Sequence, residues 1–267
     1  MSMTDLLPVL LISGTGLLAG IMLAVFAKVF EVKVDPKITE IAAVLPGANC
    51  GACGFAGCDA YANQIVSEHA AITLCRPGGD EVRKSIAGIM GMDDSGEGVE
   101  RMYACVRCNG TCEATEKSMD YQGIQTCEAC NSFFSGNSAC FYGCLGFGDC
   151  VNTCPEHAIS IIDGTATIIR SKCIGCGLCA DKCPKNIIDM VPLSKATFVA
   201  CANNDKGAQT RKVCKNGCIA CRKCEKACQF DAIHVVNNVA QIDYSKCTGC
   251  NACVEGCPTK VILTYMN

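Results

Sequence analysis

The sequence predicts an α+β protein in which small metal-binding modules, rather than one large apolar core, organise most of the chain. Three observations lead to this prediction: 27 Cys among 267 residues with no Trp, cysteine spacings that recur along the chain, and a long uncharged apolar run near the N-terminus. Small units that lack a large core are usually held together by disulfides or metals. We expect, in order, an N-terminal transmembrane helix, a small helical four-cysteine domain, a cysteine-containing linker and two tandem copies of a further cysteine module, at residues 1–30, 31–92, 93–132, 133–205 and 206–267.

The cysteine spacing favours metal centres over disulfides. The number of Cys is odd, and most of them lie two or three residues apart. Neighbouring thiols on a short loop are well placed to bind one metal centre. Disulfides are the alternative interpretation of so high a cysteine content. Thiolate centres also imply a reducing compartment. The net charge of −3 is small, and no basic tract indicates a nucleic-acid partner.

The apolar run Leu6–Ala27 is 22 residues without a charge. At 1.5 Å per residue, a helix of this length spans a bilayer core of about 30 Å. A cleaved signal peptide is the alternative, but it would need a positive N-terminal region and a shorter run, and the charge before this run is Asp5. Lys28, Lys33 and Lys37 follow the run, so we expect a single-pass protein of the inner (cytoplasmic) membrane with the bulk of its chain in the cytoplasm.

The first cysteine module has the spacing C-x2-C-x4-C-x16-C, with glycines around its first three Cys. Glycines let a loop wrap tightly and direct backbone N–H groups toward cluster sulfurs. A short helix expected at Ala60–His69 brings the chain back to the fourth Cys. Four thiol ligands suit an iron–sulfur cluster, with zinc as the alternative. The expected ligands are Cys50, Cys53, Cys58 and Cys75.

The run C-x2-C-x2-C-x3-C-P occurs twice, at Cys173–Pro184 and Cys247–Pro258. This run is the signature of bacterial ferredoxins, in which three thiols hold one cluster and the fourth binds the neighbouring cluster. Cys154 and Cys228 each lie 19 positions before their run, and eight Cys of each copy coincide at an offset of 74. Such coincidence indicates an internal duplication. We therefore predict two ferredoxin-like modules, each with a short β-hairpin after its Cys154 or Cys228.

The two copies differ at one ligand position. The second has Cys218, Cys221 and Cys224, whereas the residue that matches Cys221 in the first is Phe147. We expect Cys140 to replace the missing ligand. The expected ligand sets are Cys140, Cys144, Cys150 and Cys183; Cys154, Cys173, Cys176 and Cys179; Cys218, Cys221, Cys224 and Cys257; and Cys228, Cys247, Cys250 and Cys253.

Seven Cys lie outside these sets. Cys105, Cys108, Cys112 and Cys127 have the spacing of a further site, with Cys130 as an alternative fourth ligand. Cys201 and Cys214 are expected to pack as small buried groups. We thus expect five [4Fe-4S] clusters, and six if the set that begins at Cys105 also forms.

Basic residues surround one cysteine loop of the second module. They either balance the negative charge of a cluster or form a docking surface for an acidic electron donor. These residues are Lys215, Arg222, Lys223 and Lys226.

The order of parts resembles the B-subunit family of the Rnf complex, over nearly the whole chain. Besides the apolar run and the two ferredoxin-like modules, the resemblance rests on Pro46–Cys58, Val106–Gly110 and Tyr142–Cys150. Gln229 departs from the pattern, because ferredoxin runs usually have Pro there, and this puts the local loop geometry in doubt.

The resemblance implies a subunit of an ion-translocating ferredoxin:NAD oxidoreductase. It would take electrons from reduced soluble ferredoxin and pass them to membrane and peripheral partner subunits, with NAD reduction coupled to Na+ or H+ movement. The chain has no G-x-G-x-x-G motif, so NAD should bind elsewhere. The alternatives are the sister complex that keeps a redox-sensing transcription factor reduced, a soluble polyferredoxin with a cleaved leader, and a structural zinc protein.

Overall fold

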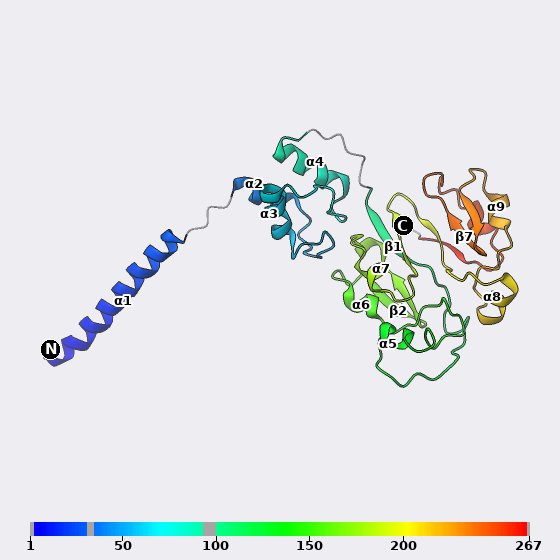
Figure 1. The fold of residues 1–267 in the computed structure, drawn as a ribbon, viewed down its shortest axis with the longest axis horizontal. Coiled ribbons are helices and arrows are strands. Elements are labelled where there is room, and N and C mark those ends of the chain that lie inside the picture. The colour runs from blue at the N-terminus through cyan, green and yellow to red at the C-terminus, as the bar shows by residue number, and fades with distance from the viewer. Residues whose placement is uncertain (1–2, 31–34, 93–99, 266–267) are drawn as a thin grey trace.

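The computed structural model describes residues 3–30, 35–92 and 100–265, and for residues 3–12 it describes the backbone alone. Helix α1, Met3–Val29, is set apart from the other elements in Figure 1. The predicted span Leu6–Ala27 lies partly outside the described side chains, because it includes residues 6–12. Within the described part of the chain, no helix has both the length and the apolar character needed to cross a membrane.

Three helices form the first module, and they pack around a core of Ile41, Tyr61, Ile65 and Ile86. The first begins where the side chain of Asp35 accepts a hydrogen bond from the Lys37 backbone N–H, with Pro in its first turn. The third ends at Gly91 in the left-handed conformation, a common helix terminus. The helices are α2, Pro36–Val44; α3, Cys58–Glu68; and α4, Gly79–Met90.

Two antiparallel strand pairs, three short α-helices and one 3-10 helix build the described part of the first ferredoxin-like module. Strand β1 pairs with β4, so that Met102 lies opposite Pro192, and β2 pairs with β3. Short helices follow the left-handed residues Gly148 and Gly177. The elements are β1, Met102–Val106; α5, Cys127–Asn131; α6, Asp149–Thr153; β2, Ile159–Ile162; β3, Thr165–Ile168; η1, Arg170–Lys172; α7, Leu178–Lys182; and β4, Ile188–Pro192.

The second ferredoxin-like module repeats this plan. Its central hairpin pairs β6 with β7, and β5 pairs with β8 so that Thr197 lies opposite Thr264. Its elements are β5, Thr197–Val199; α8, Gly207–Val213; α9, Lys223–Ala227; β6, Ile233–Val236; β7, Val239–Ile242; α10, Ala252–Glu255; and β8, Ile262–Thr264.

The predicted duplication and both predicted hairpins are confirmed in the backbone. Helices α6 and α9, strands β2 and β6, and strands β3 and β7 each begin 74 positions apart. The hydrogen bond from Ile169 N to Ala158 O (2.7 Å) recurs as the bond from Asp243 N to Ala232 O (2.8 Å). The same hydrogen-bonding pattern thus closes each hairpin.

The strand pairings correct two of the expected boundaries. Strand β1 falls in the predicted linker 93–132, yet it pairs with β4 of the first ferredoxin-like module. Strand β5 falls in the predicted segment 133–205, yet it pairs with β8 of the second. Each module is closed by pairing its first strand with its last, and cysteine spacing does not predict this pairing of distant strands.

Candidate metal centres

The four predicted thiols of the first module lie close together. The thiol of Cys75 interacts electrostatically with those of Cys58, Cys50 and Cys53, and burial raises its pKa. Asn49 fixes the loop, because its side-chain oxygen accepts a hydrogen bond from Cys58 N (2.8 Å) where α3 begins. The loop and the helix start therefore present all four thiols to one place.

Cys154, Cys173, Cys176 and Cys179 also lie together. The thiol of Cys179 interacts with the other three, and burial raises its pKa to about 12. Backbone N–H groups are directed at two of the sulfurs, from Ala158 to Cys154 Sγ (3.4 Å) and from Ala104 to Cys173 Sγ (3.5 Å). The second donor belongs to β1, so the outer strand pair helps to position this site.

The next site corrects the assignment of Cys140. An atom-free space of about 360 Å³, open solvent included, is lined by Cys144, Cys150 and Cys183 together with Cys127. The thiol of Cys150 interacts with those of Cys144, Cys127 and Cys183, and burial raises its pKa to about 12. Cys140 lies elsewhere, where its thiol interacts with Cys214. Cys127 thus takes the place that Phe147 leaves without a thiol.

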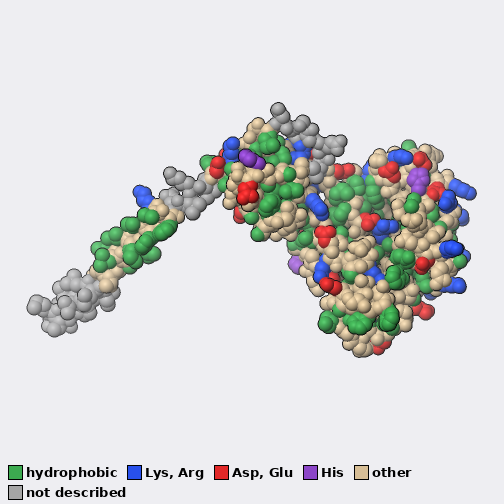
Figure 2. Space-filling view, in the orientation of Figure 1, with side chains coloured by type: hydrophobic (Ala, Val, Ile, Leu, Met, Phe, Trp, Pro, Cys, Tyr) green, Lys and Arg blue, Asp and Glu red, His purple; other side chains and the backbone are tan. Residues whose placement is uncertain are grey.

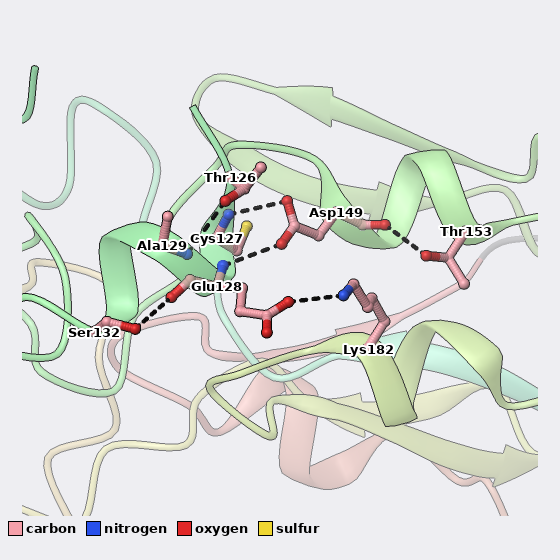
Figure 3. A network of polar contacts seen from close by, with 8 residues as sticks. All are labelled: Thr126, Cys127, Glu128, Ala129, Ser132, Asp149, Thr153 and Lys182. Carbon is pink, nitrogen blue, oxygen red and sulfur yellow. Dashed lines mark hydrogen bonds and ion pairs between the residues drawn. The ribbon is translucent and has the colours of Figure 1, made fainter. Parts of the chain in front are cut away.

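A polar network, drawn in Figure 3, holds Cys127 in position. The carboxylate of buried Asp149 accepts hydrogen bonds from the backbone N–H groups of Cys127 (2.9 Å) and Glu128 (3.1 Å) at the start of α5. Thr126 caps the same helix through Ala129 N. Because Asp149 immediately precedes Cys150, its hydrogen bonds to the start of α5 fix the position of Cys127 relative to Cys150.

In the second ferredoxin-like module, one predicted set surrounds a cavity of nearly the same size. Cys228, Cys247, Cys250 and Cys253 line an atom-free space of about 360 Å³, open solvent included. The thiol of Cys253 interacts with the other three, and burial raises its pKa to about 11. The backbone N–H of Ala232 donates to Cys228 Sγ (3.4 Å), which repeats the bond to Cys154 in the first copy.

Cysteines of the other predicted set of this module belong to the module's hydrophobic core or pack against it. The thiol of Cys224 interacts with those of Cys218 and Cys221, and burial raises its pKa to about 11. Cys257 packs against the core cluster that contains Cys218 and Cys224. Cys221 is exposed, so this site lies near the surface.

The structure places the thiols predicted as a further site, Cys105, Cys108, Cys112 and Cys127, in different surroundings. Cys105 is buried in β1, in a cluster with Tyr103 and Val191, and Cys112 lies against Gly164 in the β2–β3 turn. Cys127 belongs to the cavity with Cys150. Pairing of β1 with β4 separates residues that are near one another in sequence, and spacing alone does not show this.

The chemistry of these sites fits iron–sulfur clusters. Among the described residues, no three His, Cys, Asp or Glu side chains converge closely enough to hold a single metal ion. Two of the four-thiol sets stand around a cavity, as the ligands of a cluster of several atoms do. Backbone N–H groups directed at the sulfurs are typical of cluster sites. Burial raises the pKa of Cys75, Cys150 and Cys179, so metal binding at these thiols would release protons.

Neighbouring thiol sets lie next to one another. Cys176 interacts with Cys50 of the first module, and the guanidinium of Arg76 lies against Gly177. Cys150 interacts with Cys179, which joins the two sets of the first ferredoxin-like module. The sets therefore form a row that begins in the helical module.

Comparisons with known proteins agree with this arrangement. A family described as "Putative Fe-S cluster" matches residues 45–77, and the "4Fe-4S binding domain" family matches residues 166–189 and 240–263. The chain is 42% identical over 252 residues to the B subunit of the ion-translocating oxidoreductase complex of Methanosarcina acetivorans (94% of this chain, 95% of the relative). It is 46% identical over 258 residues to the B subunit of the Na+-translocating ferredoxin:NAD+ oxidoreductase complex of Acetobacterium woodii (96% and 77%). It is 41% identical over 251 residues to the B subunit of the proton-translocating ferredoxin:NAD+ oxidoreductase complex of Clostridium ljungdahlii (92% and 88%).

The fold and the thiol sets define an iron–sulfur protein of the ferredoxin class with several 4Fe-4S binding sites. Identity above 40% along nearly the whole chain narrows this class further. The chain belongs to the B-subunit family of ion-translocating oxidoreductase (Rnf) complexes, and the resemblance predicted from its motifs is confirmed.

Proposed function

We propose that this chain is the iron–sulfur electron-transfer subunit of an ion-translocating complex. It accepts single electrons from reduced ferredoxin and relays them to partner subunits, which reduce NAD while Na+ or H+ crosses the membrane. Relatives with these activities in their names are 46% and 41% identical to it. The observation that carries the proposal is the row of neighbouring thiol sets. Clusters held by these thiols would supply one-electron redox chemistry at each position.

The order of the row follows the order of the modules. One end is the helical module, where Cys50 lies near Cys176, and this module follows α1 in the chain. The second ferredoxin-like module comes last in the chain, and its Cys221 and Cys250 are exposed. A soluble donor can reach these exposed sites, whereas membrane partners are nearer to the helical module. We therefore assign electron entry to the second ferredoxin-like module.

We further assign α1 as the membrane anchor in the inner membrane, with the later modules in the cytoplasm. Its run from Leu6 to Ala27 carries no charge, and Lys28 follows it. The large apolar side chains from Leu17 to Phe30 are 48–71% exposed, and they cover the described part of α1 in Figure 2. Apolar side chains exposed along a whole helix need a lipid or protein environment.

The basic residues of the second ferredoxin-like module provide a docking surface for an acidic donor. Lys215, Arg222, Lys223 and Lys226 lie near Cys221 in the sequence, and all four are exposed. Lys and Arg side chains gather along this outer edge of the molecule in Figure 2. Complementary charge speeds association and makes it sensitive to salt.

Reduction by ferredoxin tests this proposal. The full chain, purified in detergent without oxygen, should lose visible absorbance when a catalytic amount of a two-cluster ferredoxin is kept reduced by a ferredoxin-reducing enzyme and its substrate, and the rate should fall as salt rises. The double variant Arg222→Glu/Lys223→Glu should slow the reaction about tenfold by reversing charge at the docking surface. Lys37→Glu, a change in the helical module, is the matched control and should leave the rate unchanged. A chain that ferredoxin cannot reduce would contradict the proposed function.

A further inference from the structure

Four cysteines outside the sites described above line one further cavity. They are Cys108, Cys140, Cys201 and Cys214, and the cavity lies where the two ferredoxin-like modules meet. Its atom-free space is about 370 Å³, open solvent included, against about 360 Å³ for each of the two other four-cysteine cavities. The three cavities are thus alike in size and in thiol number, which supports the same kind of occupant.

The cavity is built from equivalent parts of the duplication. Cys140 and Cys214 are 74 positions apart, so they are the same residue in the two copies. Cys108 and Cys201 each stand two positions after the end of an outer strand, β1 or β5. Each module therefore contributes the same pair of thiols to one shared site.

The hydrogen bonds to these sulfurs repeat in the same way. Cys108 Sγ accepts from Gly110 N (3.4 Å) and Cys144 N (3.3 Å). Cys201 Sγ accepts from Asn203 N (3.5 Å) and Cys218 N (3.3 Å), the equivalent residues of the second copy. These bonds are as short as those to Cys154 and Cys228 in the ferredoxin sites.

The side chain of Asn203 completes the polar surroundings. Asn203 is 1% exposed, and its Nδ2 donates to Cys140 Sγ (3.4 Å). The thiols of Cys140, Cys201 and Cys214 are buried, and those of Cys140 and Cys201 interact with each other. N–H groups directed at buried sulfurs stabilise thiolates, the form that binds iron.

We propose that Cys108, Cys140, Cys201 and Cys214 hold a [4Fe-4S] cluster that bridges the two ferredoxin-like modules; this inference rests on the iron–sulfur character proposed for the other sites. Two contacts define the bridge. Cys144, a thiol of the first module's cavity, donates its N–H to Cys108, and Cys218 of the second module donates to Cys201. The bridging site thus lies between the two modules and makes the row of thiol sets continuous.

Iron content tests the bridging site. The full chain purified without oxygen should hold about 24 iron and an equal amount of acid-labile sulfide, four for each of six sets. The double variant Cys201→Ala/Cys214→Ala should hold about 20 of each. The matched control Cys105→Ala/Cys130→Ala removes two buried cysteines outside all six sets and should hold about 24. A double variant that keeps the iron of the unaltered chain would overturn the inference.

Native mass spectrometry of the unaltered chain gives a second measurement that does not depend on how the variants fold. Six clusters per chain support the bridging site, and five overturn it. One zinc per chain that is lost in Cys201→Ala/Cys214→Ala, with iron unchanged, would also overturn the cluster assignment. A chain with little iron and sulfide anywhere would instead contradict the proposed function, so the two failures are distinguishable.

Discussion

The two ferredoxin-like modules share the same backbone plan but complete one ligand set differently. In the second, the loop supplies Cys218, Cys221 and Cys224 in one short run. In the first, Phe147 occupies the position of Cys221, and Cys127 on α5 approaches the cavity from a separate segment. A duplicated module can therefore keep a four-thiol site while one ligand moves to another part of the chain.

The neighbouring residues differ in a matching way. Asp149, which holds the start of α5, is equivalent in position to Lys223 of the second copy. The second copy has no α5 to hold, because Cys201 and Cys214 are 13 positions apart whereas Cys108 and Cys140 are 32 apart. The extra residues of the first copy contain both Cys127 and the helix that presents it.

The largest effect is expected when the thiol that differs between the two modules is removed from each of them. Cys127→Ala and Cys221→Ala should each remove about four iron, because each takes one of four thiolates from a cluster. Cys130→Ala is the matched control, since Cys130 is buried on the same helix as Cys127 but lies outside the cavity. Iron and sulfide analysis checks this prediction. Unchanged iron in Cys127→Ala would show that this thiol is not a ligand.

The second prediction moves the thiol of the first module to the position that it has in the second module. Adding Phe147→Cys to Cys127→Ala gives the first module the thiol position of the second, and it should restore most of the four lost iron. This variant also loses the Phe147 ring, which contacts the Tyr121 ring edge-on with 5.7 Å between the ring centroids. Stability should therefore recover only in part. The EPR spectrum of the reduced double variant should again contain the signal of the unaltered chain. No recovery in the double variant would mean that the two loops differ in more than one ligand.

A smaller effect is expected at Asp149. Asp149→Ala leaves the buried N–H of Cys127 without its acceptor, which should lower the free energy of unfolding by about 1–3 kcal/mol. Chelator-driven iron release should become faster at the same time. Lys223→Ala, the equivalent position of the second copy, is the control and should change neither quantity. Equal effects of the two substitutions would contradict a special role for Asp149.

The smallest effect is expected at the ion pair between Lys182 and Glu128 (2.8 Å), which Figure 3 also draws. Both side chains are largely exposed, and exposed pairs contribute little. Lys182→Ala should therefore leave iron content and the rate of iron release unchanged. A clear loss of iron would show that the pair, and not Asp149, positions α5.

Local cysteine runs were predictable from the sequence, because the few residues between neighbouring cysteines cannot separate their thiols by a large distance. This holds for the runs that begin at Cys50, Cys173 and Cys247, and the hairpins after Cys154 and Cys228 followed from the same repeat. Both hairpins were confirmed by their strand pairings.

The ligands that come from distant segments were not predictable in this way. Cys127 reaches its cavity through an inserted helix, and Cys108 and Cys201 reach theirs through strand pairs that close each module. One signal was present in the sequence: Cys140 and Cys214 coincide in the repeat, and Cys214 is not needed to complete a ferredoxin run, although we expected Cys140 to complete the first one. A cysteine shared by both copies but spare in both indicates a site between them.

The most direct test of the whole account is the metal content of the full chain purified without oxygen, with iron, acid-labile sulfide and zinc measured on the same sample. The account predicts at least about 20 iron with matching sulfide, rising to about 24 with the bridging site, and no stoichiometric zinc. About eight iron together with stoichiometric zinc would contradict it.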